Sequence, residues 1–475
     1  MLSKGINMAL QMATTIILAR LLMPADFGIL AMATMVTGLA LIFQDLGLGQ
    51  ALVQRKAIRR EHTSSAFWGT LVMALLLYAG VFLSAPLVAD YFSEPRMVPV
   101  LKLIALIFLL SPFAVVPRAL LQRELDFKTP FFAGLASSIA YGSVGITMAL
   151  LGYGYWALVG GALASGLVAT SALCILTRYL PPLVPSFRGI KDLYGFGVGI
   201  TGIAIGHYIA EKIDYFAIGR RLDSNALGLY THAYSFVTYP ALLAGSIAPI
   251  FFPAFSKMQD DHPRMQNAYG RVTTLLAIIF FPALAIAIIS APELIPTVFG
   301  EQWRPAVVPA QIMVMIGMFK IVSTPASAVI KATAHVYGSA WRQFLYGALI
   351  GTGAWFAAPH GIVAVAVAVA CANVVHYLLI GHLVWVAIDF GIADYGRVFR
   401  GPVIVTIATV SVAIACRYGS VVADHGAVVT LLLTIIPAAL TALLLARVLP
   451  LREVECALDE LRGFSRQCLG AVRFW

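Results

Sequence analysis

The stretch GIVAVAVAVACANVVHYLLIGHLVWVAI, residues 361–388, contains no Lys, Arg, Asp or Glu. An α-helix rises about 1.5 Å per residue, so roughly 20 apolar residues cross the hydrocarbon core of a bilayer, which is about 30 Å thick. Similar stretches recur along the chain and predict about fourteen transmembrane helices. Twelve is the alternative, because the first, eleventh and thirteenth stretches are the weakest. The predicted spans are 5–22, 28–47, 66–88, 97–119, 131–151, 155–177, 195–219, 227–254, 272–292, 305–330, 342–358, 361–388, 401–416 and 427–448.

The composition supports a membrane protein. Hydrophobic residues make up 60% of the 475 residues, and charged residues only 11%. Soluble domains carry about 25% charged residues, so a water-soluble protein of this size could not cover its surface. The formal net charge is +10. Because Lys and Arg gather in short loops between apolar stretches, this charge indicates membrane topology rather than nucleic-acid binding.

The loops between the predicted spans alternate between basic and nearly neutral. Placing the basic loops, Lys4, Arg118 and the tail from Arg447 on one side gives that side 23 of the 32 Lys and Arg residues. The opposite side holds seven, and Lys212 and Lys320 lie within spans. Cytoplasmic loops carry the excess of basic residues, so both termini are predicted to be cytoplasmic. The basic loops are 54–60, 123–128, 178–191, 257–271, 331–342 and 397–400.

The first apolar stretch, 5–22, follows Lys4 and lacks a small-residue cleavage site. We therefore interpret it as a retained span rather than a removable signal peptide. Because it barely reaches the length of a span, a translation start upstream is left open.

Motifs of common soluble enzymes are missing from the sequence. Residues 197–202 match GxGxxG, but they lie inside an apolar span, where small residues favour close helix packing instead of nucleotide binding. There is no P-loop, HExxH or GxSxG motif. The five cysteines form no CxxC pair, so neither a metal site nor a disulfide is predicted. We predict no catalytic residues and no cofactor.

The seventh predicted span carries four ionisable residues within two helical turns. His207, Glu211 and Asp214 have i,i+4 and i,i+3 spacings, which place them on one face, and Lys212 is turned by about 100° from Glu211. Ionisable groups inside a membrane are costly and commonly functional. The functional interpretation is a proton- or cation-coupling site that lines a wet cavity. The alternative is a structural salt bridge to another helix.

Two further cations are candidates for the same cavity. Lys320 lies some fifteen residues into the tenth predicted span, too deep to reach the outer surface easily, and a buried ion pair is its alternative role. Arg20 lies near the outer end of the first span and is interpreted either as an interfacial anchor or as a substrate ligand. Asp45 is expected to end the second span beside glycines, and Asn373 and His376 are expected to make an interhelical hydrogen bond.

The chain shows a trace of internal duplication. Arg20 and Gly28 recur as Arg220 and Gly228, each pair 200 positions apart, around the same outward turn of a helical hairpin. The pattern predicts that the first six and second six spans are parallel repeats, an arrangement found in transporters. Chance similarity between two apolar hairpins is the alternative.

Several segments together resemble a known family. They are ILARLLMPADFG at 17–28, DLGLGQALVQR at 45–55, GYWALV at 154–159, KIDYFAIGR at 212–220, ALGLY at 226–230 and FPAFS at 252–256. The chain resembles the polysaccharide transport (Wzx-type) branch of the multidrug/oligosaccharidyl-lipid/polysaccharide exporter superfamily. The likeness covers roughly the first 260 residues, and the rest agrees mainly in hydropathy.

The resemblance implies a fold and a function. The expected fold is all-α and V-shaped, with six-helix lobes at 1–192 and 193–390, helices 13 and 14 at 391–450, and a cytoplasmic tail at 451–475. The expected function is flipping of undecaprenyl-diphosphate-linked oligosaccharide repeat units across the bacterial cytoplasmic (inner) membrane, for lipopolysaccharide or exopolysaccharide biosynthesis. A polysaccharide polymerase and a chain-length regulator are candidate partners.

The resemblance also implies roles for the ionisable residues. A basic cavity between the lobes would accept the diphosphate through Arg20, Lys212 and Lys320, and protonation of Glu211 or Asp214, with His207 beside them, would couple transport to an ion gradient. Two alternatives remain open. A multidrug or small-cation extruder of the same superfamily would favour an acidic, aromatic cavity. A membrane polysaccharide polymerase or acyltransferase would need a long outward loop or an intramembrane catalytic motif.

Overall fold

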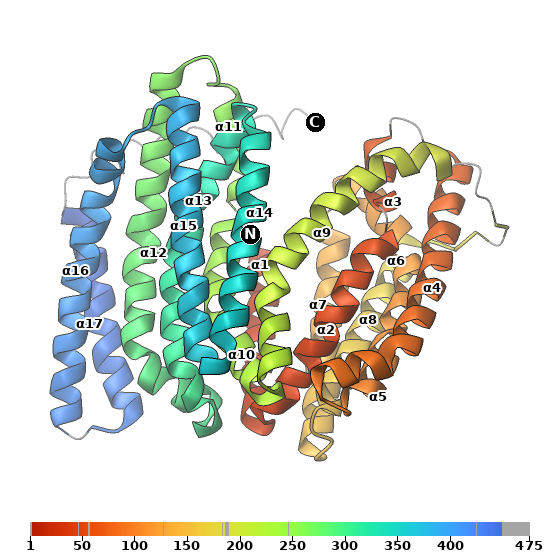
Figure 1. Cartoon of the computed structure of the whole chain (residues 1–475), viewed down its shortest axis with the longest axis horizontal. Helices are drawn as coiled ribbons and strands as arrows, with labels where there is room; N and C mark the ends of the chain where they lie inside the picture. Colours follow the sequence, from red (N-terminus) through yellow and green to blue (C-terminus); the bar gives the residue numbers. More distant parts are fainter. Residues whose placement is uncertain are drawn as a thin grey trace. The chain divides into compact units, whose positions relative to one another are not determined.

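The computed structural model describes residues 2–448 except 46, 56–57, 127, 183, 186–189, 246 and 424. The helices of its first half are α1 (Leu2–Leu21), α2 (Pro24–Asp45), α3 (Leu48–Gln54), α4 (Arg60–Phe92), α5 (Met97–Ile104), α6 (Leu106–Arg123), α7 (Lys128–Leu150) and α8 (Trp156–Thr177). Those of its second half are α9 (Ile190–Arg221), α10 (Ser224–Gly245), α11 (Ala248–Ser256), α12 (His262–Phe299), α13 (Val307–Ala332), α14 (Val336–Ala357), α15 (Ile362–Ile388), α16 (Ile392–Val422) and α17 (Ala427–Val448), with 3-10 turns at Glu301–Ala306 and Ala358–His360 (Figure 1).

The predicted all-α membrane fold is confirmed. Within the described ranges every regular element is helical, and helices lie at each of the fourteen predicted span positions. Ten helices or helix pairs of this part of the chain are long and apolar enough to cross a membrane, and a bent pair, Ser224–Gly245 with Ala248–Ser256, makes an eleventh. The first predicted span is a shorter apolar helix, Gly5–Leu21. The predicted tail, 451–475, lies outside the described residues.

Two predicted spans each consist of two helices, and one of these pairs, α10 with α11, is bent by 42°. The span expected at 227–254 consists of α10 and α11, and the span at 97–119 changes from α5 to α6 at Ala105. Proline contributes to irregularity of this kind, because it cannot donate a backbone hydrogen bond. Pro249 stands at the start of α11, four residues after Gly245, the last residue of α10. Hydropathy alone did not reveal these breaks, since the residues on both sides are equally apolar.

The internal duplication is visible in the helix boundaries. Helices α2 and α3 begin at Pro24 and Leu48, and α10 and α11 begin at Ser224 and Ala248, so the two pairs are offset by 200 residues. The expected end of α2 at Asp45 is confirmed, and Gly47 just beyond it has φ 69°, a left-handed conformation that glycine tolerates. The repeat therefore extends beyond the short sequence match to a whole helix and the short helix after it.

The chain packs as two compact units. Unit 1 comprises residues up to 231 together with 354–362, and unit 2 comprises 232–353 together with the residues from 363. In unit 1, α7 packs against α8 and α1, and α4 against α6. In unit 2, α12 packs against α13, α16 and α17. The predicted lobes, divided between 192 and 193, stay a prediction.

Small residues bring the helices of unit 1 together. A Cβ at Gly161 of α8 would lie 3.0 Å from the backbone oxygen of Tyr141, and one at Gly142 would lie 2.9 Å from Oγ1 of Thr14. Small residues of this kind let membrane helices approach closely, because lipid supplies little hydrophobic driving force between them. Such contacts hold α7 between α1 and α8.

Helix α12 is the longest element, with 38 residues, and organises unit 2. Its buried face contributes Met265, Tyr269 and Leu276 to the main core cluster of the unit. Near its other end, Glu293 accepts from Arg417 of α16, with Nη2 and Oε1 2.7 Å apart. Pro282, Pro292 and Pro296 all lie in its second half.

The turn between α4 and α5 ties two hairpins of unit 1 together. The Glu94 carboxylate accepts from Arg96, with Nε and Oε1 2.7 Å apart, and from Oγ of Ser224 at 2.9 Å. The hydrogen bond from Arg96 lowers the pKa of Glu94 and raises that of Arg96. Because Ser224 begins α10, this carboxylate anchors the start of the second repeated hairpin.

We expect stability to depend on the charge of Glu94. Its folded-state pKa is lowered, so its contribution is present above the unfolded-state pKa of about 4.3 and is lost as the pH falls through the folded-state value. A contribution of about 1 kcal/mol or less is expected, because the Arg96 side chain is half exposed to solvent. Thermal unfolding between about pH 6 and about pH 3 should show a smaller decrease of the midpoint for Glu94→Gln than for the wild type. Glu124→Gln, at an exposed loop position, should behave like the wild type, and an unchanged pH response of Glu94→Gln would contradict the assignment.

Candidate functional site

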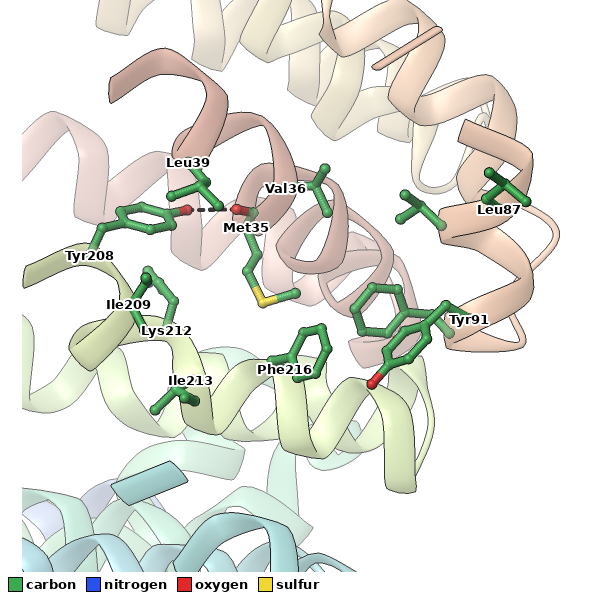
Figure 2. A pocket seen from close by; sticks show the side chains of 12 residues that line it. Met35, Val36, Leu39, Leu87, Tyr91, Tyr208, Ile209, Lys212, Ile213 and Phe216 are labelled. Atoms are coloured by element: carbon green, nitrogen blue, oxygen red, sulfur yellow. Dashed lines mark hydrogen bonds between the residues drawn. The ribbon is translucent and has the colours of Figure 1, made fainter. Parts of the chain in front are cut away.

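A pocket in unit 1 is the principal candidate site. It has a volume of about 450 Å³ and lies between α2, α4 and α9 (Figure 2). Its walls are almost entirely apolar or aromatic, and Lys212 is the charged residue among them. The lining residues are Met35, Val36, Leu39, Leu87, Val88, Tyr91, Phe92, Tyr208, Ile209, Lys212, Ile213 and Phe216.

The spacing of residues along α9 produces one wall of this pocket. Tyr208, Lys212 and Phe216 follow one another at intervals of four, and Ile209 and Ile213 fill the adjoining row. Residues three or four positions apart lie on the same face of a helix. The sequence analysis identified Lys212 but missed this stripe, although its i,i+4 spacing was available.

Lys212 lies beside an aromatic ring. Its Nζ is 4.1 Å from the ring centre of Tyr215, and its side chain is half-buried. A cation over an aromatic face is stabilised by the negative potential of the ring. This contact holds the charge at the border of an apolar pocket.

Aromatic residues close the other end of the pocket. Tyr91 of α4 stacks on Phe216 of α9, with ring centres 5.1 Å apart and planes 26° apart. The guanidinium of Arg220 lies 5.0 Å from the Tyr91 ring centre. The aromatic wall thus carries a second cation, one that the sequence analysis noted only as the repeat partner of Arg20.

Tyr208 joins α9 to α2. Its hydroxyl donates to the backbone oxygen of Met35, with the two oxygens 2.9 Å apart, as the dashed line in Figure 2 shows. Gly38 leaves the room for this ring, because a Cβ there would lie 2.3 Å from the Tyr208 hydroxyl oxygen. The hydrogen bond fixes the distance between two walls of the pocket.

The structure separates the three predicted ion-coupling residues. His207 and Glu211 are exposed, with Nδ1 and Oε2 3.7 Å apart. Asp214 is buried, and its carboxylate accepts from the Tyr230 hydroxyl at 2.7 Å and from the backbone amide of Tyr215 at 2.9 Å. Asp214 therefore ties α9 to α10, whereas the other two lie at an accessible surface.

The other predicted substrate ligands are exposed. Arg20 lies at the end of α1 in unit 1. Lys320 lies in α13 of unit 2, where its Nζ is 3.3 Å from the Tyr234 hydroxyl and 5.7 Å from that ring centre. Each position allows contact with a substrate, and their roles stay predictions.

Metal ligands do not gather in the described part of the chain, where no group of three His, Cys, Asp or Glu side chains could hold an ion. Cys174, Cys371 and Cys416 are free thiols. Cys456 and Cys468 lie outside the described residues. The candidate site is lined by hydrocarbon and aromatic side chains together with Lys212.

Known proteins share this chain's sequence pattern. A model of the family described as polysaccharide biosynthesis proteins matches residues 17–308, more than half of the chain. The chain belongs to this family. The resemblance noted in the sequence is therefore confirmed, and it extends some fifty residues further than expected.

Individual proteins of known name are similar to the chain. The lipopolysaccharide biosynthesis protein WzxC of Escherichia coli (strain K12) is 27% identical over 67% of this chain and 66% of the relative. The succinoglycan biosynthesis transport protein ExoT of Rhizobium meliloti (strain 1021) is 28% identical over 69% and 66%. The teichuronic acid biosynthesis protein TuaB of Bacillus subtilis (strain 168) is 25% identical over 78% of each chain. The alignments thus span about two thirds to four fifths of these relatives.

Solved structures share the fold of this family member. An inward closed structure of the lipid II flippase MurJ has a TM-score of 0.73 at 11% identity, over 94% of this chain and 97% of that one. An inward-facing multidrug resistance MATE family transporter has a TM-score of 0.66 at 14% identity, over 80% and 94%. The chain is a multi-pass membrane protein with the fold of these transporters.

Proposed function

We propose that this chain is a flippase that moves undecaprenyl-diphosphate-linked oligosaccharide repeat units across the bacterial cytoplasmic membrane, for lipopolysaccharide or exopolysaccharide biosynthesis. Membership in the polysaccharide biosynthesis family supports the proposal, as do relatives named for lipopolysaccharide biosynthesis and succinoglycan transport. The observation that carries it is Lys212, a cation of α9 at the border of an apolar pocket.

The chemistry of the pocket matches both parts of such a substrate. A diphosphate is anionic and cannot cross hydrocarbon alone, so it needs cations at depth in the membrane. Ammonium and guanidinium groups form strong charge-assisted hydrogen bonds with phosphate oxygens. The apolar walls beside Lys212 accommodate hydrocarbon, such as the first isoprene units next to the phosphates. Arg20 and Lys320 are proposed as further phosphate or sugar ligands along the route.

Energy coupling is assigned to the acidic residues of α9. His207 and Glu211 form an accessible pair that can exchange protons or cations with water. Asp214 is proposed to respond through its hydrogen bond to Tyr230, which connects α9 to α10. Transport in proteoliposomes should then depend on an imposed proton or cation gradient.

No enzymatic step is part of this proposal, because a transporter needs only binding sites and a conformational cycle. Both termini are proposed to be cytoplasmic, with the basic loops inside. A polysaccharide polymerase and a chain-length regulator are the proposed partners, which would consume the flipped repeat units at the outer surface.

The test is transport by the purified full chain in proteoliposomes. A fluorescent undecaprenyl-diphosphate-linked oligosaccharide is incorporated, and its exposure to an impermeant quencher is followed with time. We expect flipping above that of protein-free vesicles, and no uptake of a small organic cation such as ethidium. Ethidium transport without lipid flipping would establish the drug-extruder alternative, and covalent change of the lipid-linked sugar would establish an enzyme.

A further inference from the structure

Unit 2 contains a buried cation without a carboxylate partner. Arg342 of α14 is only 8% exposed. Its Nη1 donates to the backbone oxygen of Gly338 at 2.7 Å, and its Nη2 lies 3.4 Å from Nδ1 of His382 of α15. Its Nε has no hydrogen-bond partner, and among the described residues no acidic group forms a salt bridge with it. Arg342 was expected at the end of the basic loop 331–342, but it lies within a helix, because α14 begins at Val336.

A buried charge of this kind needs an anion. Removing an ion from water costs several kcal/mol unless an opposite charge or hydrogen bonds replace the water. One neutral carbonyl and one histidine nitrogen leave most of the guanidinium's five N–H donors unused. The planar guanidinium matches the oxygens of a phosphate group, so a phosphate is the ligand that best completes this site.

The site lies near the ends of two helices, where a membrane interface is expected. Arg342 lies six residues after the start of α14, and His382 lies six residues before the end of α15. Both are therefore about 9 Å inside the helix ends, at the same level. Trp341 and Trp385 beside them are 50% and 48% exposed. Exposed tryptophans are typical of the zone where lipid headgroups meet the acyl chains.

A pocket adjoins the histidine of this pair. It has a volume of about 380 Å³ and is lined by His262, His382, Trp385, Val386, Ala387 and Asp389, so the pair reaches it through His382 and not through Arg342. Trp341 covers the guanidinium, whose carbon is 4.6 Å from the ring centre. Gly338 allows the close contact of the two helices, because a Cβ there would lie 3.1 Å from Leu383. Polar side chains of the pocket thus lie beside exposed tryptophans, an arrangement that suits a lipid with a polar headgroup and apolar chains.

We propose that Arg342, with His382 beside it, binds the phosphate of a resident phospholipid between α14 and α15. The lipid would remain in its own leaflet, with its acyl chains outside the helices and its phosphate against the guanidinium. The site is built from residues of unit 2, whereas the Lys212 pocket is built from residues of unit 1, and the proposal does not depend on the function proposed above.

The test measures lipid binding rather than transport. The full chain is purified in detergent, and native mass spectrometry follows binding of dioleoylphosphatidylglycerol and of dioleoylglycerol, which has the same chains without the phosphate. We expect the wild type to bind the phospholipid at least about tenfold more tightly than the diacylglycerol. Arg342→Gln should lose most of this preference. Arg400→Gln, which removes the same charge from an exposed position at the same end of unit 2, should keep it.

Thermal unfolding without added lipid provides a second readout. Because Arg342→Gln removes an uncompensated buried charge, its midpoint in lipid-free detergent should equal or exceed that of the wild type. Addition of the phospholipid should raise the midpoint of the wild type alone. Equal phospholipid binding by Arg342→Gln and wild type would overturn the proposal. So would equal stabilisation by inorganic phosphate, which would indicate a soluble anion, or displacement of the phospholipid by an equimolar amount of undecaprenyl phosphate, which would assign the site to transported lipid.

Discussion

Gly28→Ala is expected to destabilise the protein more than other single substitutions in unit 1. A Cβ at Gly28 of α2 would lie 1.6 Å from the backbone oxygen of Ser224, and a Cβ at its repeat partner Gly228 would lie 1.8 Å from the backbone oxygen of Pro24. Overpacking usually costs about 1 to 3 kcal/mol, because flexible side chains can yield. Here the obstacle is backbone, so the two hairpins must separate and we expect a loss of more than about 3 kcal/mol.

The measurement is the thermal unfolding midpoint of the purified chain, with Gly80→Ala as the control. Gly80 lies in α4 with no atom within 4 Å of its added Cβ, and replacing an exposed helical glycine by alanine is neutral or slightly stabilising. Gly228→Ala should resemble Gly28→Ala. The double substitution should cost less than the two separate effects together, because both open the same contact. A wild-type midpoint for Gly28→Ala would mean that the hairpins do not meet in this way.

Lys212→Gln is expected to reduce the rate of lipid-linked oligosaccharide flipping by about tenfold to a hundredfold. Hydrogen bonds to charged groups contribute about 1.5 to 3 kcal/mol, and each 1.4 kcal/mol corresponds to about a factor of ten. Glutamine retains a polar side chain of similar length but has no charge to offset the diphosphate. Lys212→Arg keeps the cation and should retain much of the activity.

The initial flipping rate in proteoliposomes checks this expectation, with Lys102→Gln as a matched control. Lys102 also lies over an aromatic ring of unit 1, with its Nζ 4.4 Å from the ring centre of Phe82, but it does not line the pocket. The Lys102→Gln variant should therefore flip the lipid-linked oligosaccharide at the wild-type rate. Equal flipping rates for Lys212→Gln and wild type would show that the substrate does not need the Lys212 pocket. The family assignment would be unaffected.

Much of the fold could be predicted because lipid offers no hydrogen-bond partners to the backbone. Each backbone polar group must be satisfied within its own helix, so the apolar stretches alone located the helices. Local signals also worked where one residue type determines the geometry. Gly47 follows the end of α2, and Asn373 of α15 accepts a hydrogen bond from the Tyr346 hydroxyl of α14 at 3.1 Å, as was expected. The same expectation is not met at His376, whose ring centre lies 4.4 Å from that of Tyr346 and whose buried Nδ1 has no hydrogen-bond partner.

The site was harder to predict because it depends on which residues of separate helices meet. Lys212 and Asp214 are two residues apart, yet one borders an apolar pocket and the other is buried against Tyr230. Spacing along α9 predicts the directions of their side chains but not the helices that they contact. The roles of Tyr208 and Arg342 could not be predicted for the same reason. Tyr208 contacts α2 and Arg342 contacts α15, and both helices lie far away in the sequence.

The length of α12 has a mechanical consequence. Its 38 residues make a rod about 57 Å long, whereas the hydrocarbon layer is only about 30 Å thick. Such a rod must project into the aqueous phase or lean strongly. Pivoting it by about 10° about one end would sweep the opposite end through roughly 10 Å, by the geometry of a helix this long. A slight rearrangement of side chains at one face of the bilayer would then become a displacement as wide as a whole helix at the other.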